Sequence, residues 1–396
     1  MFFNFKRLFC IFIKLNCKTE IICIYLICIV CYNNNVNQKK WGDELDSNLN
    51  HSEKSTIISS LQALRGIAFL GIASFHCGLS LFGSWSVSVF FMLSGFLTMR
   101  SYMNKTFQCS LKNNIVFSLK KIAKLYPMYA ITTIAMIFIH NSFSPKIIAI
   151  NLFLVQSWIP DSNIFYSLNG VAWFFSDLLF IYMIFPIIGK VIQKYKSKKT
   201  AIIVSCVILF VLACVSLFAR VLNGQNESLS EFCKWIGYVC PVTRLGDFAV
   251  GCNLYYIFDN SKKEMSSTKA TVYEILAILV TGISQVLFYF NAKKEIQDSM
   301  LYLYIPISML CVYLFTIKRG FFTGILSNKL LIGVGDLSNY AFLLHRPTMD
   351  LLYSVIKSGG LNHRVYDIII FTLSTLIALL LSWLYSKLRV YIKKKT

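Results

Sequence analysis

The fold class of this chain is decided by residues 61–82, which read LQALRGIAFLGIASFHCGLSLF. A helix needs about 20 mostly apolar residues to cross the hydrocarbon core of a bilayer, and this stretch meets that length. Further apolar stretches follow at 84–103, 122–141, 171–192, 200–222, 233–257, 271–290, 299–317, 335–356 and 366–389. The sequence therefore predicts an all-α, polytopic integral membrane protein with about ten transmembrane helices in one bundle.

The composition excludes an ordinary soluble domain. Of the 396 residues, 56% are hydrophobic and 14% are charged, whereas globular domains carry about 25% charged residues. The formal net charge of +21 would favour a nucleic-acid partner if it formed one basic face, but the Lys and Arg residues lie in short loops between apolar stretches. We therefore expect a membrane-lipid environment and no nucleic-acid partner.

The basic residues concentrate in alternate loops and so predict a topology. Lys and Arg cluster at 105–124, 190–199, 262–269, 318–329 and 387–395. Because cytoplasmic loops carry the excess of positive charge, we expect a cell inner (cytoplasmic) membrane protein whose core domain has both ends in the cytoplasm. Counting Ile147 to Trp158 as a full span would break this alternation, so a re-entrant or interfacial piece is expected there.

Three parts of the chain differ in character. Residues 1–60 form an N-terminal extension with a basic start and a short apolar run, which fits a signal-like segment, an interfacial helix or a mistaken translation start. Residues 61–390 form the membrane domain, and residues 391–396 a short basic cytoplasmic tail. Cys28 and Cys31 make a C-x-x-C in the extension without a neighbouring His or second pair, so no metal or redox cofactor is expected.

Arg65 and His76 are the first candidates for chemistry. Eleven residues are close to three helical turns, so both side chains lie on one face of the first helix, about 16 Å apart along its axis. Ionisable groups inside a span are costly and usually functional. Arg65 would otherwise be a snorkelling anchor, and His76 a polar residue hydrogen-bonded within the bundle.

That pair and four later blocks resemble the bacterial acyltransferase-3 family. The pair matches its Arg-x10-His signature, and residues 86–97, SVSVFFMLSGFL, match a G-V-x-x-F-F-x-L-S-G-F-L segment apart from Ser86. The other blocks are WFFSD at 173–177, RLGDFAVG at 244–251 and SNYAFLLHRP at 338–347. The chain departs from the family pattern in having Asp177 for a commoner Glu, Lys121 and Lys124 for an R-x-x-R, and the unusual Arg346.

The resemblance implies an O-acetyltransferase that moves an acyl group, expected to be acetyl, from cytoplasmic acyl-CoA to a hydroxyl of an envelope or lipid-linked carbohydrate. It implies that the catalytic residues are His76, Arg65, Asp177 and His345, and that Arg65, Lys121, Lys124 and Arg244 bind the acyl-CoA donor. An imidazole suits general-base work near neutral pH, and Lys and Arg suit the phosphates of the donor. His345 would meet His76 at mid-depth. Asp177 would orient a His or cap a backbone group, and Arg244 with Asp247 would otherwise be an internal ion pair.

Two alternatives stay open at this point. The acceptor would instead be a small lipid-linked sugar, an amino sugar or an antibiotic-like metabolite, if acceptor choice lies in the extracytoplasmic loops. A second class is a polytopic glycan transporter or exporter without acyl-transfer activity, in which Arg65 and His76 line a translocation path. We favour the enzyme because the family blocks occur in order along the chain. The sequence does not indicate an oligomeric state.

Overall fold

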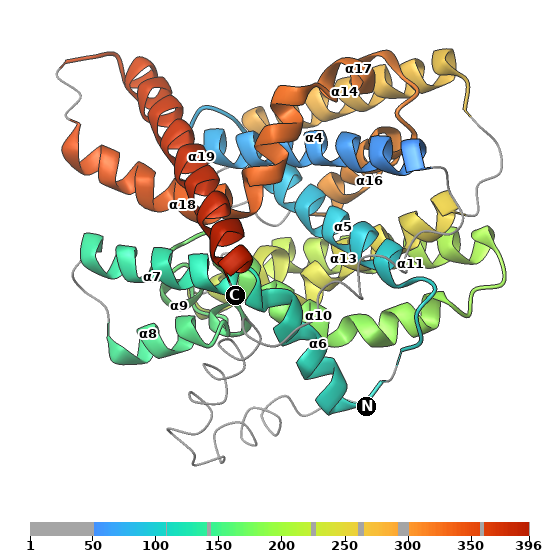
Figure 1. The fold of residues 1–396 in the computed structure, drawn as a ribbon, viewed down its shortest axis with the longest axis horizontal. Helices are drawn as coiled ribbons and strands as arrows, with labels where there is room; N and C mark the ends of the chain where they lie inside the picture. Colours follow the sequence, from blue (N-terminus) through green and yellow to red (C-terminus); the bar gives the residue numbers. More distant parts are fainter. Residues whose placement is uncertain are drawn as a thin grey trace. The chain divides into compact units, whose positions relative to one another are not determined.

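The computed structural model describes residues 51–107, 109–140, 144–222, 227–259, 265–291, 301–356 and 360–395, and these ranges are helical with no strand (Figure 1). Contacts divide the chain into two units, of which one comprises residues Met1–Leu49 with Tyr391–Thr396 and the other Asn50–Val390. Everything below concerns the second unit. The predicted extension lies outside the described residues up to position 50, and residues 51–60 belong to the first described helix.

Each apolar stretch named above is helical over most of the residues that the structure describes. The long helices are α4 (His51–His76), α5 (Gly83–Tyr102), α6 (Leu111–Ala123), α7 (Tyr126–His140), α10 (Trp173–Ile192), α11 (Lys198–Leu222), α13 (Pro241–Asp259), α14 (Ser267–Asn291), α16 (Leu301–Ile317), α18 (Lys329–Val355) and α19 (His363–Lys395). The short ones are α8 (Pro145–Leu152), a 3-10 turn at Gln156–Trp158, α9 (Ser162–Phe165), α12 (Glu227–Lys234), a π-helix at Trp235–Val239 and α17 (Phe321–Leu326).

The structure differs from the predicted segments in three places. The helix predicted at 61–82 begins earlier, at His51, and ends at His76. The stretch 122–141 is one limb of a broken element, because α6 and α7 meet at a bend of 66° beside Lys124 and Leu125. The stretch 233–257 begins in α12 and passes through the π-helix before α13 starts at Pro241. Proline fixes its own backbone and lacks an N–H, so it favours a helix start at that point.

The membrane character is clear, although the number of crossings is not fixed by helix length and composition. Three helices, α10, α11 and α19, are long and apolar enough to cross a membrane, and the bent pair of α6 and α7 adds a fourth if it is one span. Large apolar side chains such as Ile203, Phe210 and Leu380 are exposed on α11 and α19, as lipid contact requires. Ten crossings stay a prediction, because α4, α5 and α18 carry glycines, serines and ionisable residues that lower their hydropathy.

Two glycines hold α4 directly against α18. A Cβ atom on Gly66 would collide with the carbonyl of Leu331, and one on Gly335 would collide with the carbonyl of Gln62. Small residues allow this close backbone approach between helices in membranes. Further along both helices, the Cys77 thiol lies 3.3 Å from the Met349 sulfur.

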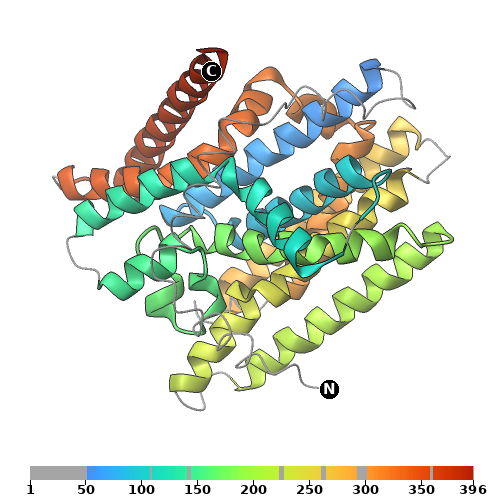
Figure 2. The same cartoon turned by 60° about the horizontal axis from the view of Figure 1, so that its bottom comes forward.

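Because the glycine contact and the sulfur contact follow one another in the same order along both helices, α4 and α18 run parallel, side by side (Figures 1 and 2).

A second glycine contact joins α5 to α13. A Cβ on Gly95 would collide with the Phe248 carbonyl, and one on Gly251 with the Met92 carbonyl. The Cys252 thiol donates to the Gly95 carbonyl at 3.4 Å across the same contact. Most of α5 is buried as a result, which places this helix in the interior between α4, α13 and α16.

The α4–α18 contact gives a stability prediction. Gly335→Ala must push the Gln62 backbone away, so we expect the free energy of unfolding to fall by about 1–3 kcal/mol, the usual cost of overpacking. The matched control is Gly333→Ala on the same helix, where an added Cβ meets nothing within 4 Å. At that position, alanine restricts the unfolded backbone more than glycine does. The free energy of unfolding should therefore stay equal or rise by about 0.5–1 kcal/mol. Thermal unfolding in detergent measures both, and equal melting temperatures for the two variants would contradict the contact.

Candidate active site

His76 and His345 lie face to face between α4 and α18. Their ring centroids are 5.4 Å apart and their planes are tilted by 38°. His345 is 1% exposed, whereas His76, at the last residue of α4, is partly exposed. The parallel packing of the two helices brings these side chains together across 269 positions of sequence.

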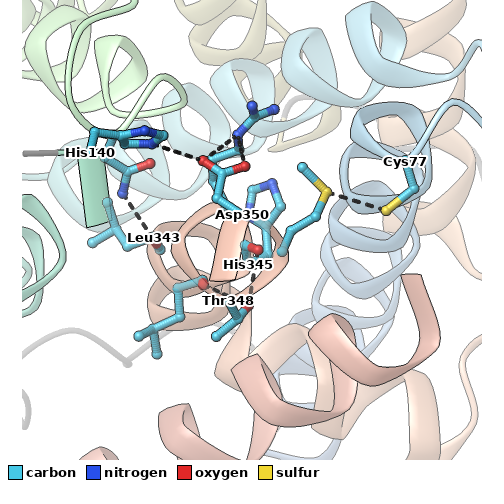
Figure 3. A network of polar contacts seen from close by, with 10 residues as sticks. Cys77, His140, Leu343, His345, Thr348 and Asp350 are labelled. Carbon is cyan, nitrogen blue, oxygen red and sulfur yellow. Dashed lines mark hydrogen bonds and ion pairs between the residues drawn. The ribbon is translucent and has the colours of Figure 1, made fainter. Parts of the chain in front are cut away.

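The imidazole of His345 is held in one tautomer. Its Nδ1 lies 2.7 Å from the Phe342 carbonyl one turn earlier, and a carbonyl oxygen only accepts, so Nδ1 carries the hydrogen. Nε2 is buried without a hydrogen-bond partner. Phe69 of α4 packs against the ring edge-on, with centroids 6.0 Å apart. With the hydrogen on Nδ1, the neutral form of His345 (Figure 3) presents a lone pair on Nε2 in the protein interior, and the ring of His76 lies close by.

Arg65 lies about three turns before His76 on α4. Its Nη1 donates to Gln62 Oε1 at 3.5 Å, its Nε is buried without a partner, and it interacts electrostatically with Tyr182 and Asp336. Between Arg65 and His76 the same face of α4 carries Phe69 and Ile72, both fully buried. Arg65 and the imidazole pair thus mark the two ends of an apolar stripe about 16 Å long.

Lys121 joins Arg65 at that end of the stripe. Its ammonium lies 5.8 Å from the centroid of Tyr182, the ring that also interacts with Arg65, and 4.9 Å from the centroid of Tyr102. Cations over aromatic faces are attracted by the ring quadrupole. Lys124 is exposed one turn further on and adds to the positive charge around Lys121. The structure therefore gathers three of the four residues predicted to bind the donor, from α4 and from the end of α6.

Arg244, the fourth of those residues, lies in a different place. It is completely buried, its Nε donates to the Tyr238 carbonyl at 2.6 Å, and its Nη1 donates to Asp247 at 3.1 Å. Its guanidinium carbon lies 4.4 Å from the centroid of Tyr238 and 5.4 Å from that of Trp173. Within the described residues none of its contacts is with Arg65 or Lys121, so the internal ion pair with Asp247 is what the structure shows.

Asp177 belongs with Arg244 rather than with the histidines. The side chain is fully buried near the start of α10, and it interacts electrostatically with Arg244 and Asp247. Neither carboxyl oxygen has a hydrogen-bond partner, since the nearby Ser157 hydroxyl donates to Ser176 instead. Over the part of the chain that the structure describes, Asp177 therefore neither orients a histidine nor caps a backbone group. Its position one turn after Trp173 directs it toward α13.

Three residues near the histidines escaped the sequence reasoning, and a fourth, Arg346, was noted there only as a departure from the family pattern. Asn169 is buried and donates to the Leu343 carbonyl at 2.9 Å, which ties the segment before α10 to α18. His140, at the end of α7, lies 3.4 Å from Asp350, and Arg346 lies 2.9 Å from Asp350. The i, i+4 spacing of Arg346 and Asp350 within an apolar stretch could have predicted their ion pair. Nothing in the sequence indicated that His140 or Asn169 would reach α18.

No group of three or more His, Cys, Asp and Glu side chains that could hold a metal ion occurs in the described ranges. The N-terminal cysteines at 10–31, including the C-x-x-C, lie outside them. The site is thus described by three groups of residues: the imidazole pair, the basic end formed by Arg65, Lys121 and Lys124, and the buried charge cluster of Arg244, Asp177 and Asp247.

A membrane protein with paired imidazoles in its interior and a basic end three turns away fits a membrane-bound group-transfer enzyme. The family model described as an acyltransferase domain, Acyl_transf_3, matches residues 58–387. The chain belongs to this acyltransferase-3 family.

One curated relative carries the same activity in its name. The chain is 27% identical over 195 residues to the protein described as acyltransferase MdmB of Streptomyces mycarofaciens, a match that covers 46% of this chain and 48% of that protein. The chain thus spans about half the length of this relative. No solved structure matches the chain.

The buried charge cluster gives a second stability prediction. Arg244→Met leaves Asp177 and Asp247 buried without their counter-charge, and breaking a buried pair in this way costs about 3–5 kcal/mol. The double variant Arg244→Met with Asp247→Leu removes one orphaned carboxyl and should recover part of the loss. Arg220→Met, at an exposed arginine of α11, is the matched control. Thermal unfolding in detergent is the measurement, and a single variant as stable as the control would contradict the pairing.

Proposed function

We propose that this protein is an O-acetyltransferase that moves an acetyl group from cytoplasmic acetyl-CoA to a hydroxyl of an envelope or lipid-linked carbohydrate. The family and the relative support acyl transfer in general. The observation that carries the proposal further is the His76–His345 pair, with the unpartnered Nε2 of His345, three turns along α4 from Arg65 and the nearby Lys121.

The imidazole pair supplies the proton chemistry. An imidazole accepts the proton of the acceptor hydroxyl as the oxygen attacks the thioester carbonyl, the carbon–sulfur bond breaks, and the proton passes to the sulfur of the leaving CoA thiol. We assign the first step to His76, which is partly exposed at the end of its helix. His345, whose tautomer is fixed by the Phe342 carbonyl, stands beside it to orient it or to relay the proton.

The donor is proposed to lie along α4. Its phosphates suit the charges of Arg65, Lys121 and Lys124, and the aromatic rings around Lys121 hold that cation in place. A separation of about 16 Å between this basic end and the imidazoles requires a donor with a long arm between its phosphates and its acyl group, which is the chemistry of acyl-CoA.

Asp177 and Arg244 then support the site indirectly. Arg244 faces Phe91 and Trp173, Phe91 packs on Phe174, and Phe174 packs on Phe342 beside His345. This series of aromatic contacts connects the buried charge cluster to the imidazoles. We infer that Asp177 and Arg244 position α10 and α13 against this aromatic series.

The proposed topology places the protein in the inner membrane with ten crossings and both ends of the core in the cytoplasm. The parallel direction of α4 and α18 supports it, because the loop charges predict that both helices run outward from the cytoplasm. Under this topology Arg65 faces the compartment that holds acetyl-CoA, and the imidazoles lie toward the other side.

The test is transfer of label from radioactive acetyl-CoA to an extract of envelope glycolipids by the purified protein. His76→Ala should lower the rate at least about 100-fold, the usual contribution of general-base catalysis, and His345→Ala should also impair it. His363→Ala is the matched control, since that imidazole is 88% exposed at the start of α19. Transport of glycan without label transfer, or full activity of His76→Ala, would contradict the proposal.

Donor binding is tested separately at the end of α6. Lys121→Gln removes a charge held over two tyrosine rings, and we expect the half-saturating acetyl-CoA concentration to rise about 10-fold, which corresponds to about 1.4 kcal/mol. Lys120→Gln changes the adjacent, exposed lysine and should have a much smaller effect. The same label-transfer assay at varied acetyl-CoA measures both variants. Equal effects would show that Lys121 acts only through general positive charge.

A further inference from the structure

A polar network follows the imidazole pair on α18. Asp350 accepts from Arg346 Nε at 2.9 Å on its own helix and lies 3.4 Å from His140 Nε2 of α7. The side chains of Arg346 and His140 are 36% and 43% exposed, whereas that of Asp350 is only 12% exposed. A largely buried carboxylate thus anchors two groups that remain accessible (Figure 3).

Arg346 retains most of its hydrogen-bonding capacity. A guanidinium has five N–H donors in a rigid planar fork, and Asp350 engages the one on Nε. Its terminal nitrogens have no partner among the residues that the structure describes. Asp350 therefore fixes the orientation of the fork and leaves its outer edge available to a ligand.

The network adjoins the imidazole pair. Arg346 follows His345 directly in the sequence, and its charge acts on both His76 and His345. It also acts on Cys77, the residue after His76, which packs on Met349 of α18. The guanidinium therefore lies where α4 ends, on the side of the imidazoles that points away from Arg65.

Helix packing does not by itself account for this arrangement. Arg346 and Asp350 lie one turn apart on the same helix, so their own ion pair does not join α18 to another helix, and a partly exposed pair of this kind contributes little stability. Placing a guanidinium within a mostly apolar helix carries a cost that membrane proteins usually accept for function. Among the described residues, His140 joins the pair from α7 through Asp350.

We propose that Arg346, Asp350 and His140 form the recognition site for the acceptor, and that the part of the acceptor they hold is an uncharged ring bearing several hydroxyl groups. This inference rests on the proposed function and assigns specificity-determining residues to it. Asp350 balances the formal charge of Arg346, so this ion pair has no net charge. It offers hydrogen-bond donors on the guanidinium and acceptors on the carboxylate side by side. Hydroxyl groups, which both donate and accept, match that surface, whereas an anionic group would be opposed by Asp350.

In this arrangement the ring is held beside the imidazoles, with one hydroxyl directed at His76. The three residues act by positioning, and none of them exchanges a proton with the acceptor. Loss of the fork should therefore weaken acceptor binding and leave the donor end of α4 unchanged.

The experiment measures label transfer from radioactive acetyl-CoA at varied amounts of the envelope glycolipid extract. Arg346→Gln should raise the half-saturating amount of extract about 10-fold, with an unchanged half-saturating acetyl-CoA concentration. Arg220→Gln, at the exposed arginine of α11, controls for the loss of one guanidinium. Asp350→Asn releases the fork at nearly constant size and should also raise the half-saturating amount.

The outcomes separate this inference from the proposed function. If Arg346→Gln leaves the half-saturating amount of extract unchanged, or lowers only the rate at saturation, the recognition site is overturned. The proposed function then still stands, because the unaltered protein transfers label. A lower half-saturating amount of extract for Asp350→Asn overturns the proposal that the bound ring is uncharged. An anionic acceptor would bind better once that carboxylate is removed. Absence of label transfer by the unaltered protein overturns the proposed function, and this inference with it.

Discussion

Gly66 and Gly335 allow the backbones of α4 and α18 to touch, and the position of every proposed catalytic group follows from that contact. The two helices run parallel from it, so residues that follow each glycine by about ten positions arrive side by side. His76 and His345 meet for this reason, with centroids 5.4 Å apart. Larger side chains at the glycines would separate the helices and with them the imidazoles. In a bilayer, where apolar surface gains nothing by leaving lipid, such close backbone packing is a main source of helix association.

Aromatic rings connect two of the polar sites in the described interior. At one, Arg244 is enclosed by Tyr238, Trp173 and Phe91 and faces two carboxyl groups. At the other, His345 is enclosed by Phe69 and Phe342. The phenylalanine rings fill the space without adding hydrogen-bonding groups, and the carboxyl oxygens of Asp177 and Nε2 of His345 have no hydrogen-bond partner. Unsatisfied buried groups are unfavourable for folding, which makes their retention informative about function.

The parts of the site that depend on one helix were predictable from sequence, and the parts that depend on two were not. Arg65 and His76 share a face of α4 because helical periodicity requires it, and the apolar stretches lie on helices because their length and composition dictate it. The grouping of Asp177 with Arg244 depends on how α10 meets α13, which no local pattern encodes. The bend beside Leu125 was missed although the sequence carries a signal for it, because Pro127 lies two residues further on and favours a helix start at this point. Family resemblance supplied His345 as a candidate, while its tautomer required the Phe342 carbonyl to be located.

The helices α6 and α7 form one bent element with an angle of 66° between them. One arm carries Lys121, which lies over Tyr182 beside Arg65, and the other arm ends in His140, which reaches Asp350 beside the imidazoles. The bent pair therefore contacts both the basic group and the neighbourhood of the imidazoles. The angle at Lys124 and Leu125 sets how far apart these two contacts lie.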